Sequence, residues 1–262
     1  MSIASPLPPH SSLALHGVTL RKGASLIFEQ LSLQLSERRI GLIGDNGAGK
    51  SSLMRLLCGL DQPQAGSVLL DGQALGAGGQ RPMPGQARAV GMMFQNPDDQ
   101  IVFPTVAEEL ALSLSAQGLG RTEARSRVLG FLAERGLSAW ADRAISSLSQ
   151  GQRQQVCWLA LGIAGHNVLL LDEPYASLDL PGQALLRSQI AASTAQVLLS
   201  THALEHVRSF ERVIWLERGR VRLDGPGADV CAAYEADVVM RIAGAGLSAW
   251  ASGLGGAHES PA

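Results

Sequence analysis

A run of eight residues carries the pattern of a phosphate-binding loop. It matches Gly-x-x-x-x-Gly-Lys-[Ser/Thr] at every fixed position. Glycines let successive backbone N–H groups turn toward phosphate oxygens, the lysine reaches the β- and γ-phosphates, and the last hydroxyl ligates Mg²⁺. The pattern therefore predicts binding of ATP and Mg²⁺ rather than an ordinary glycine-rich turn. The predicted nucleotide-binding residues of this loop are Gly44, Asp45, Asn46, Gly47, Ala48, Gly49, Lys50, Ser51 and Ser52.

Two acidic residues follow a second apolar run, at 168–171. A buried strand here would place Asp172 at its carboxyl end, where a carboxylate can hold Mg²⁺ together with Ser51. The next side chain, Glu173, would point the other way and polarise a water for attack on the γ-phosphate. An Asp-Glu pair after a strand is also compatible with a helix cap, and the phosphate-binding loop is what favours the catalytic interpretation.

Around these residues the pattern predicts an α/β protein. Short apolar runs bounded by turn residues are typical of strands, and Thr105 with Glu108 is a capping-box pattern that opens a helix. The stretch of about 100–163 is mostly helical and predicts a helical subdomain inserted into the α/β core. Strands are expected at 13–20, 25–35, 39–43, 67–72, 87–94, 167–174, 195–200 and 212–217, and helices at 50–59, 105–116, 122–135 and from 150.

Composition narrows the class of protein. The 262 residues are 46% hydrophobic and 17% charged, as in a folded globular chain, and the net charge of −2 predicts no broad basic surface for nucleic acid. The three cysteines have no metal-ligand spacing. No run approaches the roughly 20 apolar residues that span a bilayer. We expect a disordered tail at 1–12, one domain at 13–243 and a flexible tail at 244–262.

A third segment resembles a family signature. Residues 148–152, Leu-Ser-Gln-Gly-Gln, resemble the LSGGQ signature of ABC ATPases, about 20 residues before the acidic strand end. The resemblance covers residues 13–235 and implies the ABC ATPase fold, a P-loop NTPase core with an antiparallel β subdomain and a helical subdomain. It implies that two chains pair head to tail around two ATP molecules. By position it assigns Ser149, Gln150, Gly151 and Gln152 to the signature, Gln95 to the Q-loop and its metal contact, Asp179 to the D-loop, and His202 to the switch histidine.

Two positions depart from the family pattern. The aromatic residue that usually stacks on adenine would fall at Lys22, whose alkyl stem could cover the base instead, as could the ring of Phe28. Weaker or less base-selective nucleotide binding follows as a hypothesis. Gln150 replaces the first glycine of the signature, while Ser149 and Gly151 remain, and we expect activity to persist.

The segment 94–102, Phe-Gln-Asn-Pro-Asp-Asp-Gln-Ile-Val, resembles the energy-coupling-factor ATPases of vitamin and metal uptake. The end of the core is most similar to biotin-type members, and cobalt- and nickel-type members remain open. In this family an acidic groove beside the Q-loop receives arginine-bearing helices of a transmembrane coupling protein. We expect Asp98 and Asp99 to contact that partner, with Glu108 and Glu109 as weaker candidates.

The resemblance thus implies an ATPase at the cytoplasmic face of the membrane. Its partners would be a second ATPase subunit, the coupling protein and a membrane-embedded solute-binding protein, with no nucleic acid. A conventional ABC importer or exporter ATPase is the alternative, followed by a non-transport ABC ATPase. About 100 residues separate Lys50 from Ser149, which leaves no room for the long coiled coils of DNA-repair types. A small-molecule kinase would lack the signature.

Overall fold

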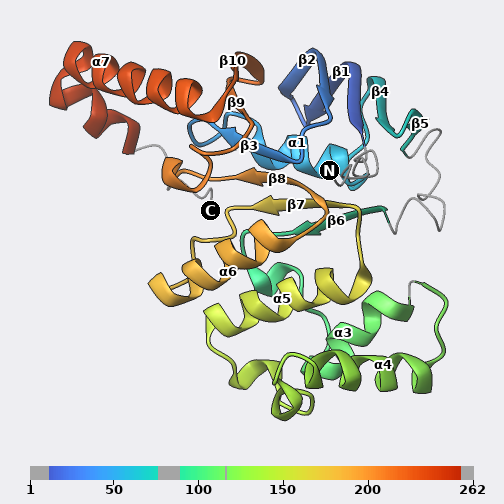
Figure 1. Cartoon of the computed structure of the whole chain (residues 1–262). Helices are drawn as coiled ribbons and strands as arrows, with labels where there is room; N and C mark the ends of the chain where they lie inside the picture. Colours follow the sequence, from blue (N-terminus) through green and yellow to red (C-terminus); the bar gives the residue numbers. More distant parts are fainter. Residues whose placement is uncertain (1–11, 76–88, 116, 255–262) are drawn as a thin grey trace, which may run out of the picture.

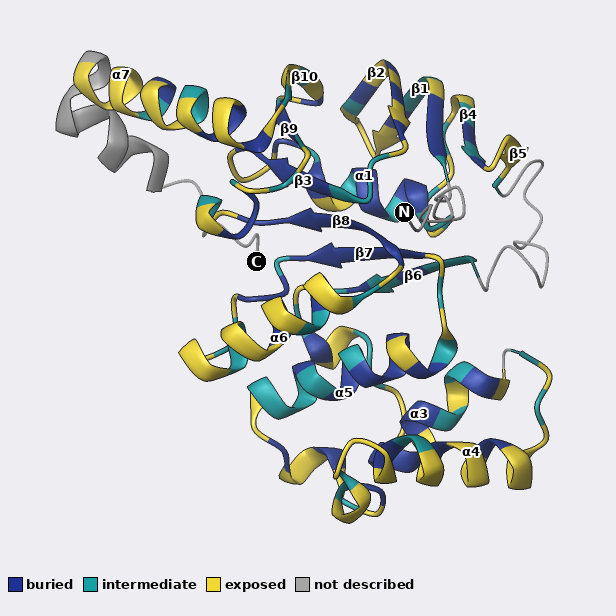
Figure 2. Ribbon diagram, viewed as in Figure 1, coloured by how far each residue is buried: buried dark blue, intermediate teal, exposed yellow. Residues whose placement is uncertain are grey.

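The main sheet has six strands in the order β10-β9-β3-β8-β7-β6, and β10 is the one that runs antiparallel to its neighbour (Figure 1). The computed structural model describes residues 12–75, 89–115 and 117–254. Strands β3, β7 and β8 are buried almost throughout, as expected of a parallel sheet covered on both faces (Figure 2). The strands are β3 (Arg39–Ile43), β6 (Val90–Met93), β7 (Val168–Asp172), β8 (Gln196–Ser200), β9 (Arg212–Glu217) and β10 (Arg220–Gly225).

A second, antiparallel sheet has the order β2-β1-β4-β5. Helix α1 (Lys50–Leu57) packs between the two sheets, and its Leu53 and Met54 are fully buried in a core that both sheets share. Gln64 lies in the segment between α1 and β4, and its side-chain oxygen accepts the backbone N–H of Arg21 at 2.6 Å. This hydrogen bond holds the segment against β1. The strands are β1 (Leu13–Lys22), β2 (Ser25–Leu35), β4 (Ala65–Leu70) and β5 (Gln73–Ala74).

The middle of the chain forms a helical layer with its own hydrophobic core. Val106, Leu110 and Val128 are fully buried between its helices. This layer, the main sheet and the antiparallel sheet confirm the predicted fold class. The helices are α3 (Val106–Ser115), α4 (Arg121–Ala133) and α5 (Gln150–Ala164), with short 3₁₀ turns η2 (Pro97–Asp99), η3 (Ser138–Trp140) and η4 (Ile145–Ser147).

The last elements are α6 (Leu180–Ala192), η5 (Leu204–His206) and the long α7 (Gly227–Leu254), which packs against β9 and β10 and then extends away from the sheet (Figure 1). Helix α7 continues to Leu254, into the segment for which we predicted a flexible tail, and its flexibility stays a prediction. Nearly all of the predicted tail at 1–12 lies outside the described residues. Among the described helices, none combines the length and the apolarity that crossing a membrane requires.

Candidate nucleotide site

The phosphate-binding loop joins the end of β3 to the start of α1, and two of its glycines have no substitute. Gly44 has φ +142°, and a Cβ there would lie 2.2 Å from the carbonyl oxygen of Leu216. Gly49 has φ +109°, and a Cβ there would lie 2.8 Å from the ring of Phe28. Only glycine combines this backbone conformation with so close an approach. The sequence motif is therefore also a packing requirement of this fold.

Lys50 is held inside its own loop. Its side chain is 7% exposed, and Nζ donates to the carbonyl oxygens of Gly44 at 2.8 Å and Asp45 at 3.2 Å. Burial lowers the pKa of Lys50, while the carboxylates of Glu173, Asp172 and Asp45 oppose that effect. A buried ammonium that hydrogen-bonds only to neutral carbonyls on the loop gains more from a polyphosphate than an exposed one would.

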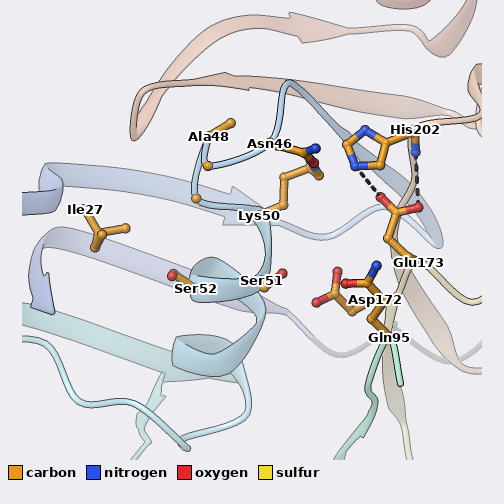
Figure 3. A pocket seen from close by; sticks show the side chains of 12 residues that line it. Ile27, Asn46, Ala48, Lys50, Ser51, Ser52, Gln95, Asp172, Glu173 and His202 are labelled. Carbon is orange, nitrogen blue, oxygen red and sulfur yellow. Dashed lines mark hydrogen bonds and ion pairs between the residues drawn. The ribbon is translucent and has the colours of Figure 1, made fainter. Parts of the chain in front are cut away.

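Asp172 ends β7 and is almost completely buried. The hydroxyl of Ser200, on the neighbouring strand β8, donates to its Oδ1 at 2.5 Å. Figure 3 shows the side chain of Asp172 beside Gln95 in the cavity that Ser51 also lines. A hydroxyl, an amide and a carboxylate are the oxygen donors that Mg²⁺ prefers. In the described residues no cluster of three or more His, Cys, Asp or Glu exists that would suit a softer metal.

Glu173 has a left-handed backbone, with φ +48°. Such a conformation is uncommon for a residue other than glycine and is found at functional sites. The Glu173 N–H donates to the carbonyl oxygen of Ser200 at 3.2 Å, which holds the turn in place. Burial raises the pKa of Glu173, and the nearby His202 and Lys50 partly offset that rise. A carboxylate with a raised pKa is the stronger proton acceptor, as a general base requires.

One cavity brings most of the predicted site residues together (Figure 3). It lies between the loop, the ends of β6 and β7, and the turn after β8. Gly44 and Asp45 belong to the loop but are not among the lining residues. The lining residues are Ile27, Asn46, Gly47, Ala48, Gly49, Lys50, Ser51, Ser52, Gln95, Asp172, Glu173 and His202.

Ile27 of β2 is the cavity residue that sequence reasoning missed. The predicted adenine contact Lys22 is outside the lining, and its Nζ pairs with Asp61 at 2.9 Å. The proposed role of the Lys22 stem stays a prediction. The alternative, Phe28, is wrong: its ring is 1% exposed and fills the space beneath Gly49. The alternation of side chains along β2 could have signalled this, because burying Phe28 turns Ile27 toward the other face.

The signature segment lies outside this cavity. Ser149 caps α5 by accepting the N–H of Gln152 at 3.2 Å, and the Gln152 side chain accepts the Ser149 N–H at 3.1 Å. This reciprocal pair is a capping box. Gln150 is exposed at the first turn, and a Cβ on Gly151 would meet Leu178 at an ordinary 3.5 Å. The α5 N-terminus thus offers its free N–H groups to solvent rather than to the chain's own loop.

Asp179, the predicted D-loop residue, caps the next helix. It accepts the N–H of Gly182 at 2.9 Å and is exposed at the start of α6. The adjacent Leu180 has 79% of its surface exposed. A leucine this exposed beside a helix cap is available to a partner, and it lies outside the cavity, like the signature segment.

The acidic residues near Gln95 differ in exposure: three are exposed and one is buried. Asp98 and Asp99 are exposed on η2, and Asp98 pairs with Nε of Arg153 at 2.9 Å. Glu108 is exposed and caps α3 with Thr105. Glu109 is only 5% exposed and accepts the N–H groups of residues 102 and 103, both at 2.9 Å. The expectation that Glu109 contacts a partner is therefore wrong, because its carboxylate holds the loop before α3.

The family assignment rests on comparison of the sequence with known proteins as well as on this geometry. The family model described as "ABC transporter" matches residues 28–176. This chain belongs to the ABC transporter family and is one of its ATPases, as the resemblance of the signature and the phosphate-binding loop led us to expect.

The names of individual relatives indicate a narrower class within this family. The chain is 43% identical to "Biotin transport ATP-binding protein BioM" of Rhodobacter capsulatus, over 83% of this chain and 91% of the relative. It is 36% identical to "Energy-coupling factor transporter ATP-binding protein EcfA1" of Lactiplantibacillus plantarum, over 78% and 73% of the two chains. The solved structure of cbiO1 from Clostridium perfringens, 24% identical, superposes with a TM-score of 0.69 over 88% of this chain and 93% of that one, and supports the fold.

Proposed function

We propose that this chain hydrolyses ATP to energise biotin uptake, as the ATPase subunit of an energy-coupling-factor transporter. The observation that carries the proposal is the division of the site: the cavity contains the phosphate loop, Asp172, Glu173 and His202, while the signature at Ser149 faces solvent elsewhere. A second chain could then bring its signature against this cavity. The relatives named for biotin transport and energy coupling supply the class of solute.

The chemistry begins with Lys50. Its Nζ now donates to two carbonyl oxygens of its own loop, and it would exchange these for the β- and γ-phosphates of ATP. Loop N–H groups and the start of α1 would bind the remaining phosphate oxygens. Ser51, Gln95 and Asp172 would hold Mg²⁺, which supplies positive charge to offset the charge on the phosphoryl oxygens.

Glu173 would accept the proton of the attacking water. Its Oε1 lies 3.2 Å from Nε2 of His202, and its Oε2 accepts the backbone N–H of the same residue at 3.2 Å. The two contacts fix the carboxylate at the mouth of the cavity. Closure by a second signature would exclude bulk water and complete the positive field around the γ-phosphate. The proposal therefore makes hydrolysis dependent on a second ATPase subunit.

The contact with the membrane would lie beside Gln95. Asp98 is exposed and already pairs with an arginine of its own chain, and the apolar Val102 and Phe103 next to it are 74% and 40% exposed. Acidic and apolar groups side by side suit an amphipathic, arginine-bearing helix. We propose that a transmembrane coupling protein docks here at the cytoplasmic face, and that a membrane-embedded protein binds the solute.

Purification of the tagged chain from detergent-solubilised native membranes tests the assembly. Mass spectrometry of the co-purifying proteins and bound small molecules should find a coupling membrane protein, a small solute-binding membrane protein and biotin. Bound cobalt or nickel in place of biotin would retain the energy-coupling class and reject the solute. A partner that is itself the whole transmembrane pathway would favour a conventional ABC transporter, and recovery without a membrane protein would reject transport.

A further inference from the structure

The carboxylate of Asp45, the second residue of the phosphate loop, is held by the C-terminal helix. Tyr234 of α7 donates its hydroxyl to Oδ1 at 2.7 Å, and Arg241 donates Nη1 to Oδ2 at 2.6 Å. These partners are almost 200 residues away in the chain. Helix α7 thus reaches a residue of the loop that does not itself line the cavity.

Neighbouring groups hold both α7 side chains in position. Asp237, one turn before Arg241, pairs with its Nε at 2.8 Å and with Nη2 of Arg222 at 2.5 Å. The side chain of Asp237 is only 10% exposed, whereas the two arginines are partly exposed. The ring of Tyr234 packs edge-on against Trp215 of β9, with centroids 5.0 Å apart. Arg241 and Tyr234 are therefore oriented toward Asp45 by packing within the fold.

Asp45 also connects to Lys50. Its backbone carbonyl accepts from Nζ of Lys50 at 3.2 Å and from the N–H of Ala48 at 3.1 Å. The side chain adds a negative charge to a loop whose role is to attract phosphate anions. Arg241 lowers the pKa of Asp45 by hydrogen bonding, so that the carboxylate stays charged. The charge is about half exposed and would repel a polyphosphate if it stood alone.

We propose that Arg241 is a positioning residue for ATP binding: it neutralises the Asp45 carboxylate and fixes the loop segment to which Lys50 is bonded. Tyr234 assists by fixing the other carboxylate oxygen. The role is carried out through Asp45, because none of the described side chains of α7 lines the nucleotide cavity. The inference rests on the proposed binding of ATP phosphates by this loop.

The test is ATP affinity of the full chain, measured by fluorescent-nucleotide titration on four variants. Arg241→Ala should weaken binding about three- to fivefold, the size of a partly exposed ion pair, and less so at high salt. Asp45→Asn should strengthen binding about two- to threefold, because the loop then loses a negative charge while Arg241 stays beside it. The double variant should recover most of the loss of Arg241→Ala, and Arg241→Lys should retain most of the affinity.

A control separates charge compensation from simple anchoring of α7. Arg208, which precedes β9, pairs with Glu235 of α7, and this ion pair does not involve the loop. Arg208→Ala should leave ATP affinity unchanged. If Asp45→Asn weakens binding as Arg241→Ala does, or if Arg208→Ala weakens it equally, α7 acts only as an anchor and the inference is wrong. Unchanged affinity in Arg241→Ala would also overturn it.

The proposed function has its own check in the same experiment. Lys50→Ala removes the charged group that would donate hydrogen bonds to the β- and γ-phosphates of ATP. The variant should therefore bind ATP at least about tenfold more weakly. If Lys50→Ala binds ATP like the unaltered chain, phosphate binding by the loop fails. If Lys50→Ala loses binding and Arg241→Ala does not, only the inference about α7 fails.

Discussion

Nε2 of His202 lies 3.2 Å from Oε1 of Glu173, and the backbone N–H of His202 donates to the second oxygen of the same carboxylate. Glu173 comes from the end of β7 and His202 from the turn after β8, two adjacent parallel strands. Because parallel strands end at the same edge of a sheet, the proximity of these two proposed catalytic residues is a direct consequence of strand order. The two residues should therefore act as a unit in hydrolysis.

Glu173→Gln should keep ATP binding and lose hydrolysis. The amide preserves shape but accepts no proton, and general-base catalysis contributes about 10²–10⁴-fold to rate. The rate of phosphate release should decrease by a factor within that range. In gel filtration, the variant should elute as a dimer when ATP is present. Hydrolysis at the unaltered rate would show that another group is the base.

The rate should depend on the protonation of Glu173. Burial raises the pKa of this carboxyl, and only the deprotonated form is a base, so activity is lost as pH falls through that raised value. His202 lowers the same pKa, so His202→Ala should move the acidic limb of the pH–rate profile to higher pH as well as lowering the maximum rate. An acidic limb that moves to lower pH, or stays in place, would contradict this coupling.

Adenine recognition should be weak in this chain. The position of the usual aromatic ring is occupied by Lys22, which pairs with Asp61, and Ile27 is the apolar side chain at the cavity. Titrations with mant-ATP and mant-GTP should differ little, and Lys22→Tyr should strengthen ATP binding several-fold, because base–aromatic stacking contributes about 1–3 kcal/mol. A strong preference of the unaltered chain for mant-ATP would contradict the hypothesis.

Glu109→Ala should destabilise the fold. Its buried carboxylate accepts two backbone N–H groups, and a hydrogen bond to a charged group contributes about 1.5–3 kcal/mol. Urea unfolding measures the change. The matched control Asp99→Ala removes an exposed carboxylate and should alter the free energy of unfolding by less than about 0.5 kcal/mol. Equal stability of the two variants would show that Glu109 is dispensable for the loop.

The sequence predicted those features that depend on local pattern. Gly44 to Ser51, Asp172 and Glu173 follow apolar strands directly, so their placement at one sheet edge could be inferred from chain order. The capping box of Thr105 and Glu108 is likewise a local signal. These contacts span a few residues or a single strand–turn–helix unit.

Contacts between distant segments could not be predicted. Glu109 looks like any acid in the first turn of a helix, and its burial depends on how the preceding loop folds over it. The contact of Arg241 with Asp45 arises from packing of α7 on β9 and β10, for which no local pattern exists.

Biotin uptake tests directly whether ATP hydrolysis by this chain energises transport. Uptake of radiolabelled biotin at nanomolar concentration should be measured in native cells that lack the chromosomal copy and carry either the unaltered chain or Glu173→Gln at equal abundance. We expect accumulation with the unaltered chain and its loss with Glu173→Gln. Equal biotin uptake in both strains, or in cells with neither chain, would contradict it.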